Sequence, residues 1–327
     1  MISLIDPSLL DNNGRLSDNL GDLIIYNSIK EQLDILFPEE SVTRISAHQY
    51  FGSSEKKLIN NAKYTFVGGT NILTSDIRNF PRFSPVKRKG FYFFPGFSRA
   101  ILWGVGWVSY QSGMDWATKI YYKRVLRKDK LHSVRDLYTL NKMKEAGFEN
   151  VIHTSCPTVW QLPNFENKFN PRLKSILFML TSYNQDTILD NHLLEIILEA
   201  GMDELYFFPQ SLNDTTYLQH LEVYQKNQEK FILLPHDLTH LTELLSSVRL
   251  NYIGSRLHGG IYCMKHIQPS LILSVDNRAL EMKKSINLNI TERNDFETVK
   301  KWITGEFVPT PVQLPLKEIE TWKHSVR

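Results

Sequence analysis

The interpretation of this chain depends on the stretch Leu250-Asn251-Tyr252-Ile253-Gly254-Ser255-Arg256-Leu257-His258-Gly259-Gly260. This stretch joins an apolar segment to a glycine-containing turn. The pattern predicts a strand over Leu250–Ile253 and a helix over Ile261–His266. The three glycines would let the backbone turn tightly and approach a ligand. Free N–H groups at the start of the helix favour a phosphate or a carboxylate. The motif therefore predicts an anion site at the end of a strand.

Two side chains of this motif carry chemistry. The planar guanidinium of Arg256 can hold an anion through two hydrogen bonds. His258 can donate or accept a proton near neutral pH. The alternative is a structural turn in which both side chains satisfy local carbonyl groups.

Short apolar runs alternate with amphipathic segments along the rest of the chain, a pattern typical of βαβ units and parallel sheets. We predict strands at Ile2–Ile5, Val42–Ser46, Tyr64–Val67, Ala100–Val105, Leu131–Val134, Ser175–Leu180, Glu204–Phe208, Phe231–Leu234 and Ser270–Val275. We predict further helices at Asp22–Phe37, Asp136–Ala146, Asp186–Ala200 and Leu238–Val248. The polar segment Gln161–Lys174 is the expected linker. The fold class is α/β, with two Rossmann-like halves that bind ligands in a cleft at the carboxyl ends of their strands.

Three motifs in the first half of the chain also place polar residues or glycines where a strand ends or a helix begins. Asn19-Leu20-Gly21-Asp22 precedes the first helix, where Asn19 or Asp22 can act as its cap or Asp22 as a base. Val67-Gly68-Gly69-Thr70-Asn71 follows a strand, and its glycines either form a plain turn or expose backbone to a sugar or phosphate. Ser133-Val134-Arg135-Asp136 places Asp136 as a helix cap and directs Arg135 towards the cleft.

Composition excludes several classes of protein. The 42% hydrophobic content is enough for folded cores. Two cysteines are too few for a disulfide framework and fit a reducing compartment. The sequence has neither GxxxxGK[ST] nor GxGxxG, so ATPase and NAD-binding functions are poorly supported. We expect no metal and no cofactor.

Together the motifs resemble the polysaccharide pyruvyl transferase family. The resemblance rests on N-x-G-D at 19–22, G-G-T-N at 68–71, S-V-R-D-x-Y-T from Ser133, and S-R-L-H-G at 255–259, in that order. It implies a GT-B-type fold with an N-terminal acceptor-side domain at 1–165, a C-terminal donor-binding domain at 175–310, and a segment at 311–327 that returns to the first domain. It also implies transfer of a pyruvyl group from phosphoenolpyruvate, the donor substrate, onto two sugar hydroxyls as a ketal, in exopolysaccharide or capsule biosynthesis.

The resemblance also implies site residues. Arg256, Leu257 and His258 would form the donor pocket, with Ser255, Gly259, Gly260, His236 and Arg278 beside them. Asn19, Gly21, Asp22, Gly68, Gly69, Thr70, Asn71 and Arg135 would bind the acceptor. As catalytic residues we expect His258, Arg256 and Asp22, with His258 as the acid and Asp22 as the base.

One departure keeps other functions open. A basic residue is expected after the first strand of the second domain, but Leu180–Asp186 contains neither lysine nor arginine. A GT-B glycosyltransferase with a nucleotide-sugar donor is therefore the alternative function, and a non-catalytic sugar-binding protein is the third. For His236, a satisfied structural histidine is the competing interpretation.

The net charge of +3 hides an uneven distribution. Residues 1–165 carry an excess of six basic side chains, concentrated between Arg78 and Lys130, where Arg78–Met114 holds no acid. Basic and aromatic residues together bind membranes or single-stranded nucleic acid. With a lipid-linked oligosaccharide acceptor in mind, we predict peripheral contact with the inner face of the plasma membrane and no nucleic acid partner. The apolar stretch Phe91–Tyr110 is interrupted, and Met1–Asp6 does not resemble a signal peptide, so the predicted location is cytoplasmic.

Overall fold

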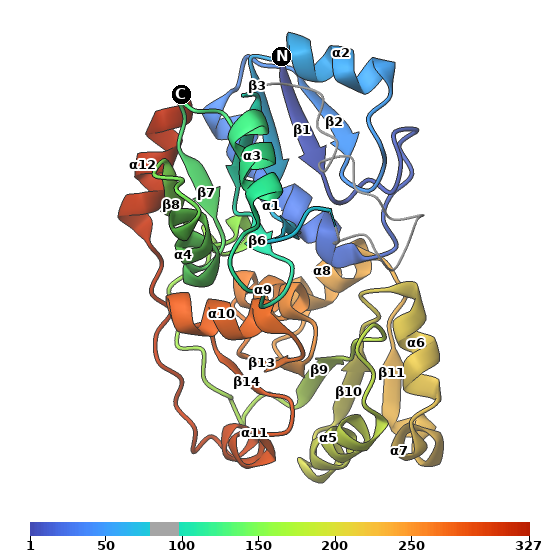
Figure 1. Ribbon diagram of the computed structural model, residues 1–327. Helices are drawn as coiled ribbons and strands as arrows, with labels where there is room; N and C mark the ends of the chain where they lie inside the picture. The colour runs from blue at the N-terminus through green and yellow to red at the C-terminus, as the bar shows by residue number, and fades with distance from the viewer. Residues whose placement is uncertain (79–97) are drawn as a thin grey trace. The chain divides into compact units, whose positions relative to one another are not determined.

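The computed structural model describes residues 1–78 and 98–327 (Figure 1). This part of the chain forms two compact units. The first unit contains Met1–Ser17, Asp22–Trp160 and Leu314–Arg327, and the second contains Asp18–Gly21 and Gln161–Gln313. Residues 18–21 therefore group with the second unit, although the sequence analysis placed them in the first domain.

A parallel sheet with the strand order β2-β1-β3-β5 forms the centre of the first unit. Its strands are β1 (Ile2–Asp6), β2 (Val42–Ser46), β3 (Tyr64–Gly68) and β5 (Ala100–Trp103). Two small parallel pairs accompany the sheet: β4 (Asn71–Leu73) with β6 (Gly106–Trp107), and β7 (His132–Val134) with β8 (Val151–His153). All five residues of β1 are buried, as expected for a strand covered on both faces.

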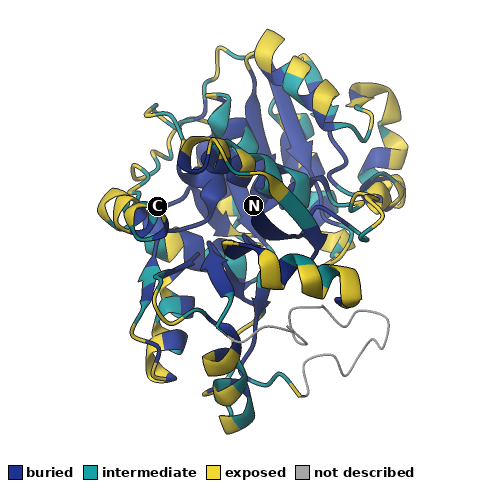
Figure 2. Ribbon diagram, turned by 90° about the horizontal axis from the view of Figure 1, so that it is seen from above, coloured by how far each residue is buried: buried dark blue, intermediate teal, exposed yellow. Residues whose placement is uncertain are grey.

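Helices surround the strands of this unit. They are α1 (Leu20–Leu36), α2 (Ser53–Asn61), α3 (Trp116–Val125), α4 (Leu137–Glu145) and α12 (Leu316–Val326). The C-terminal helix α12 packs through Trp322, whose ring lies 4.7 Å from that of Trp103 and whose Nε1 donates to the Leu131 carbonyl at 3.0 Å. Figure 2 shows the buried strands with exposed residues on the outer helical faces.

The second unit contains a six-stranded parallel sheet with the order β11-β10-β9-β12-β13-β14. Its strands are β9 (Ser175–Met179), β10 (Glu204–Phe207), β11 (Phe231–Leu233), β12 (Asn251–Gly254), β13 (Ser270–Ser274) and β14 (Ile290–Glu292). Its helices are α5 (Thr187–Glu199), α6 (Leu212–Gln219), α7 (Glu222–Lys226), α8 (Leu238–Ser247), α9 (Leu257–Lys265), α10 (Asn277–Ile286) and α11 (Phe296–Ile303). Each sheet of both units is parallel, which confirms the predicted α/β class.

The contact between β9 and β12 leaves no room for a side chain at Gly254. A Cβ there would lie 2.3 Å from the carbonyl oxygen of Met179 and 2.8 Å from its nitrogen. Both atoms belong to backbone that pairs with Gly254, so neither can rotate away.

We therefore expect Gly254→Ala to destabilise the protein by about 1–3 kcal/mol, the range typical of overpacked cores. Gly113→Ala is the matched control, because a Cβ at Gly113 meets no atom within 4 Å. The midpoint of urea unfolding measures both variants. Equal midpoints would contradict the close approach of the two strands.

Part of the segment predicted to contact a membrane, Arg78–Lys130, lies outside the described residues, because 79–97 are not described. Within residues 1–78 and 98–327, no helix has the length and apolar character needed to cross a bilayer. Membrane contact thus stays a prediction.

Candidate active site

The strand order of the second unit creates a switch point between β9 and β12. The strand β9 comes first along the chain in this sheet but lies at its centre, with β10 and β11 on one side and β12, β13 and β14 on the other. In parallel sheets of this order, ligands bind outside the carboxyl ends of the strands at such a point. The segment after β9, residues 180–186, and the motif after β12, Ser255-Arg256, meet there.

Hydrogen bonds hold these two segments against each other. The Ser255 N–H donates to the Met179 carbonyl at 2.9 Å, and the Thr181 N–H donates to Ser255 Oγ at 3.0 Å. The Tyr252 hydroxyl donates to the Arg256 carbonyl at 2.9 Å. The backbone that carries Arg256 is therefore fixed on both sides.

Arg256 is 4% exposed and forms a two-point ion pair with Asp214, which is fully buried. Its Nε donates to Asp214 Oδ2 at 3.0 Å, and its Nη2 donates to Oδ1. The same carboxylate accepts the Ser182 N–H at 3.0 Å and the Ser211 N–H at 2.9 Å. Asp214 thus ties the loops after β9 and β10 to the motif after β12, and it is not among the site residues predicted from the sequence.

Tyr183 connects Arg256 to Arg278. Its ring centre lies 5.3 Å from the guanidinium carbon of Arg256 and 5.5 Å from that of Arg278. Arg278 Nη2 donates to the Tyr183 hydroxyl at 2.6 Å, and that hydroxyl donates to Asp276 Oδ2 at 3.0 Å. Since Tyr183 is 54% exposed, the cluster reaches the protein surface. The structure therefore brings Arg278 to the segment after β9, where the sequence lacks a basic residue.

The surroundings of this cluster shift the pKa values of its acidic groups. Burial by itself would raise the pKa of Asp276, but the charge of Arg278 and the hydrogen bonds from Arg278 and Tyr183 outweigh it and lower the pKa below its ordinary 3.8. Burial raises the pKa of the Tyr183 hydroxyl, against the opposing charge of Arg278. Near neutral pH Asp276 is therefore a carboxylate and Tyr183 a neutral phenol.

His258 is the second residue of α9 and is 7% exposed, beside Leu257 at 8%. The N-cap residue of α9 is Arg256, and its side chain makes no capping hydrogen bond to the helix. By contrast, Asp276 caps the neighbouring helix α10 through the Arg278 N–H. His258 thus lies in the first turn of a helix whose N-terminal positive end has no side-chain cap.

The predicted turn at Gly259 and Gly260 ahead of the helix is wrong, because α9 begins at Leu257 and already includes both glycines. A Cβ at Gly259 would meet the Met179 sulfur at 2.3 Å, and one at Gly260 would meet Ile272 at 2.4 Å. These glycines let α9 pack closely on the sheet.

His236 follows β11 and Gln210 follows β10, and both contact the chain around Asn19 in the second unit. His236 Nε2 lies 3.1 Å from the carbonyl oxygen of Asp18 and 3.3 Å from that of Gln210. Gln210 Nε2 donates to Asn19 Oδ1 at 2.9 Å, and Asn19 Oδ1 also accepts the Gly21 N–H at 3.2 Å as the cap of α1. These contacts agree with a structural role for His236, and donor binding by His236 stays a prediction.

The remaining acceptor candidates belong to the first unit. Asp22 accepts a hydrogen bond from Ser17 Oγ at 3.0 Å. Arg135 is 3% exposed, donates through Nε to Asp136 at 3.1 Å, and donates through Nη1 to Asn71. Asp136 also caps α4 through the Thr139 N–H at 2.7 Å, as predicted. The structure therefore joins the half-buried Asn71 to the buried Arg135 through a hydrogen bond.

The glycines next to Asn71 pack against α1. A Cβ at Gly68 would lie 2.6 Å from Ile29, and one at Gly69 would lie 2.5 Å from Ile25. Thr70 follows them, and its carbonyl accepts the Gly106 N–H at 3.0 Å. This face of the turn is thus filled by isoleucine side chains.

Comparisons with known proteins agree with this architecture. Residues 19–277 match the model of a family described as polysaccharide pyruvyl transferase. Methanocaldococcus jannaschii UDP-GlcNAc 2-epimerase, solved with UDP-GlcNAc and UDP, is 12% identical and has a TM-score of 0.55, with 100% of this chain and 98% of that chain covered. The S. aureus MnaA structure with UDP is 12% identical and has a TM-score of 0.50, with 98% and 93% covered. No curated protein matches the chain. The structural likeness confirms the predicted GT-B-type fold class.

Proposed function

Because the chain belongs to the polysaccharide pyruvyl transferase family, and is thus a transferase, we propose that it moves a pyruvyl group from phosphoenolpyruvate onto two hydroxyls of a sugar. The product would be a ketal on a cell-surface polysaccharide or its lipid-linked precursor. The observation that carries this proposal is the cluster at the switch point, in which Tyr183 joins Arg256 to Arg278.

The cluster suits the chemistry of this donor. Phosphoenolpyruvate carries a phosphate and a carboxylate, so its site needs more than one fixed cation. Asp214 holds Arg256 and Asp276 holds Arg278, which places two guanidinium groups without free rotation. The N-terminus of α9 adds a partial positive charge next to them.

The reaction balances with His258 as the acid. His258 in its protonated form gives a proton to the vinyl CH2 carbon of phosphoenolpyruvate, which becomes a methyl group and leaves an oxocarbenium-like centre at the adjacent carbon. One sugar hydroxyl attacks that carbon and gives up its proton to a base. The second hydroxyl then displaces the phosphate, and inorganic phosphate leaves with the remaining proton. Asp22 in the first unit is our candidate for the base.

Donor binding tests the proposal directly. We expect phosphoenolpyruvate to raise the melting temperature of the protein, since a ligand that binds only the folded state stabilises it. The increase should disappear in Arg278→Ala and persist in Arg249→Ala, an exposed arginine of the same unit. Arg278 is the better position for this test, because removing Arg256 would leave the buried Asp214 without its cation.

The same melting-temperature measurement also distinguishes a pyruvyl transferase from a nucleotide-sugar glycosyltransferase. Stabilisation by UDP or a UDP-sugar without any response to phosphoenolpyruvate would contradict the proposal and favour a glycosyltransferase. Stabilisation by a sugar alone would favour a binding protein. Mass measurement of a candidate oligosaccharide after incubation with phosphoenolpyruvate then identifies the ketal product.

A further inference from the structure

A cavity of about 240 Å³ lies in the first unit, outside the groups described above. It is formed by the end of α3, the segment that follows it, the start of β7 and the loop between α4 and β8. Its lining residues are Lys123, Leu126, Arg127, Lys128, His132, Gly147, Phe148 and Asn150. Three of them are cations and none is a carboxylate.

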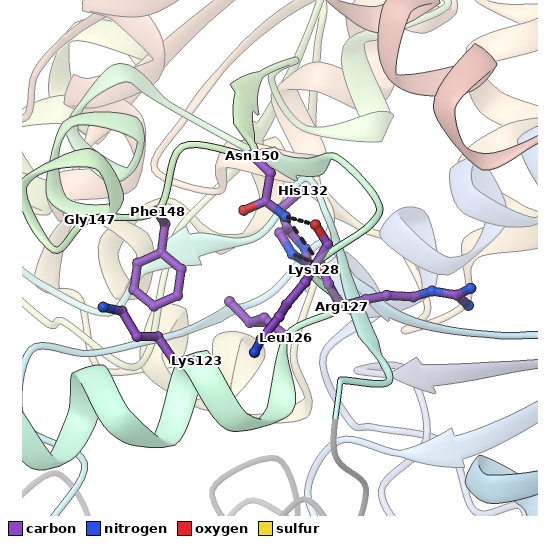
Figure 3. Close-up of a pocket in the computed structure, with 8 residues that line it drawn as sticks. All are labelled: Lys123, Leu126, Arg127, Lys128, His132, Gly147, Phe148 and Asn150. Carbon is purple, nitrogen blue, oxygen red and sulfur yellow. Dashed lines mark hydrogen bonds between the residues drawn. The ribbon is translucent and has the colours of Figure 1, made fainter.

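Two of the three cations are available to a ligand. Arg127 is paired, with Nε 2.9 Å from Asp129 Oδ1 and Nη2 3.2 Å from Oδ2. Figure 3 shows its side chain extending away from the Phe148 ring. Lys123 and Lys128 are exposed, and among the described residues neither ammonium has an ion-pair partner. The positive charge offered by this cavity therefore comes from Lys123 and Lys128.

Two uncharged residues of the cavity wall, His132 and Asn150, are held in place by hydrogen bonds. The Leu102 N–H donates to His132 Nδ1 at 3.2 Å, so Nε2 carries the hydrogen that is donated to the Arg127 carbonyl at 2.9 Å. Burial lowers the pKa of His132 to about 4, so the imidazole is neutral at physiological pH. Asn150 Nδ2 donates to the carbonyls of Arg127 and Lys130 at 3.1 and 2.8 Å. These bonds fix the turn that carries Lys128.

The cavity also offers apolar surface. Leu126 is 2% exposed and Phe148 is 6% exposed, and both line it. A ligand that satisfies every part of the lining carries a negative charge for the two lysines and carbon atoms for Leu126 and Phe148. Carboxylates and phosphates both carry such charge, but a phosphate monoester carries about two negative charges on three terminal oxygens, which match two ammonium groups better than the single charge of a carboxylate.

We propose that this cavity binds a phosphate ester with an apolar substituent, a site that is independent of the proposed donor site. The phosphate contacts Lys123 and Lys128, and the substituent packs on Leu126 and Phe148. This chemistry occurs both in soluble phosphate esters and in the head groups of anionic lipids.

The test compares two probes on the full chain. Phenyl phosphate, measured by calorimetric titration against benzyl alcohol, represents the soluble source. Flotation with vesicles of equal parts phosphatidylglycerol and phosphatidylcholine, against pure phosphatidylcholine, represents the lipid source. We expect Lys123→Gln with Lys128→Gln to weaken binding of the effective probe about tenfold or more, because it removes both charges. The matched control is Lys56→Gln with Lys57→Gln, two exposed lysines on α2 in the same unit.

The two probes distinguish a soluble ligand from a lipid head group. Loss of phenyl phosphate binding in the Lys123/Lys128 variant identifies a soluble ligand, and loss of vesicle binding alone identifies a lipid head group. The proposal is overturned if the wild-type protein binds neither probe, if benzyl alcohol binds as well as phenyl phosphate, or if the Lys56/Lys57 variant loses as much binding.

Discussion

Replacing His258 with alanine should lower the rate of phosphate release in the presence of acceptor by about 100- to 10,000-fold, the usual contribution of a general acid. The expectation follows from the position of His258 in the first turn of α9, two residues after the buried Arg256. Continuous measurement of inorganic phosphate with saturating phosphoenolpyruvate gives the rate.

Two controls isolate the proton transfer. His240→Ala removes an exposed imidazole from α8 in the same unit and should leave the rate unchanged. Stabilisation by phosphoenolpyruvate should survive in His258→Ala, which would show that the donor still binds. A near-wild-type rate in His258→Ala would mean that another group, or water, protonates the vinyl carbon.

An isotope measurement checks the same step from the product side. In deuterium oxide the exchangeable hydrogen of His258 is deuterium, so the methyl group of the ketal should gain one deuterium from the acid. The mass of the product reports this directly. A product without deuterium would exclude protonation of the vinyl carbon as part of the reaction.

The strands and the family were predictable from sequence because their signals are local. A buried parallel strand appears as a short apolar run, and each run chosen on that basis overlaps an observed strand. The missed strands β4, β6, β8 and β14 have two or three residues each, too few for a periodic pattern. The ordered motifs from Asn19 to Gly259 span a large part of the chain, which is why the family prediction was confirmed.

The partners of Arg256 and Tyr183 in the proposed donor site were not predictable from sequence in the same way. Asp214 precedes Arg256 by 42 residues, and Arg278 follows Tyr183 by 95 residues. Their meeting depends on the sheet order that places β9 between β10 and β12. One local signal for Asp214 did exist: Ser211 and Asp214 form a capping box at the start of α6. That signal indicates a helix start but says nothing of Arg256.

The glycines of the motif show a different limit of prediction from sequence. Gly254, Gly259 and Gly260 were predicted to form a tight turn that approaches a ligand, because the sequence shows that a side chain is missing but not what occupies its place. In the structure that place is taken by Met179 and Ile272. Close packing between α9 and the sheet is therefore what positions His258, and the ligand approaches from the side of Arg256 and Tyr183 in our proposal.

Replacing Asp214 with alanine should destabilise the protein by about 3–5 kcal/mol, the usual cost of removing one member of a buried ion pair. Arg256, whose side chain is 4% exposed, would stay charged in the interior without its carboxylate partner. The N–H groups of Ser182 and Ser211 would also lose their acceptor. Urea unfolding measures the change. Asp34→Ala is the matched control, since its pair with Lys30 is exposed and should leave the urea midpoint nearly unchanged.

A double variant separates the structural role of this pair from its role in donor binding. Asp214→Leu with Arg256→Met removes both charges and replaces them with apolar side chains, so most of the stability lost in Asp214→Ala should return. Phosphoenolpyruvate should nevertheless fail to stabilise it, because only Arg278 would be left of the two guanidinium groups beside Tyr183. If the double variant were stable and still responded to phosphoenolpyruvate like the wild type, Arg256 would hold the loops together without contacting the donor. In that case the anion would have to be bound by Arg278 and the N-terminus of α9.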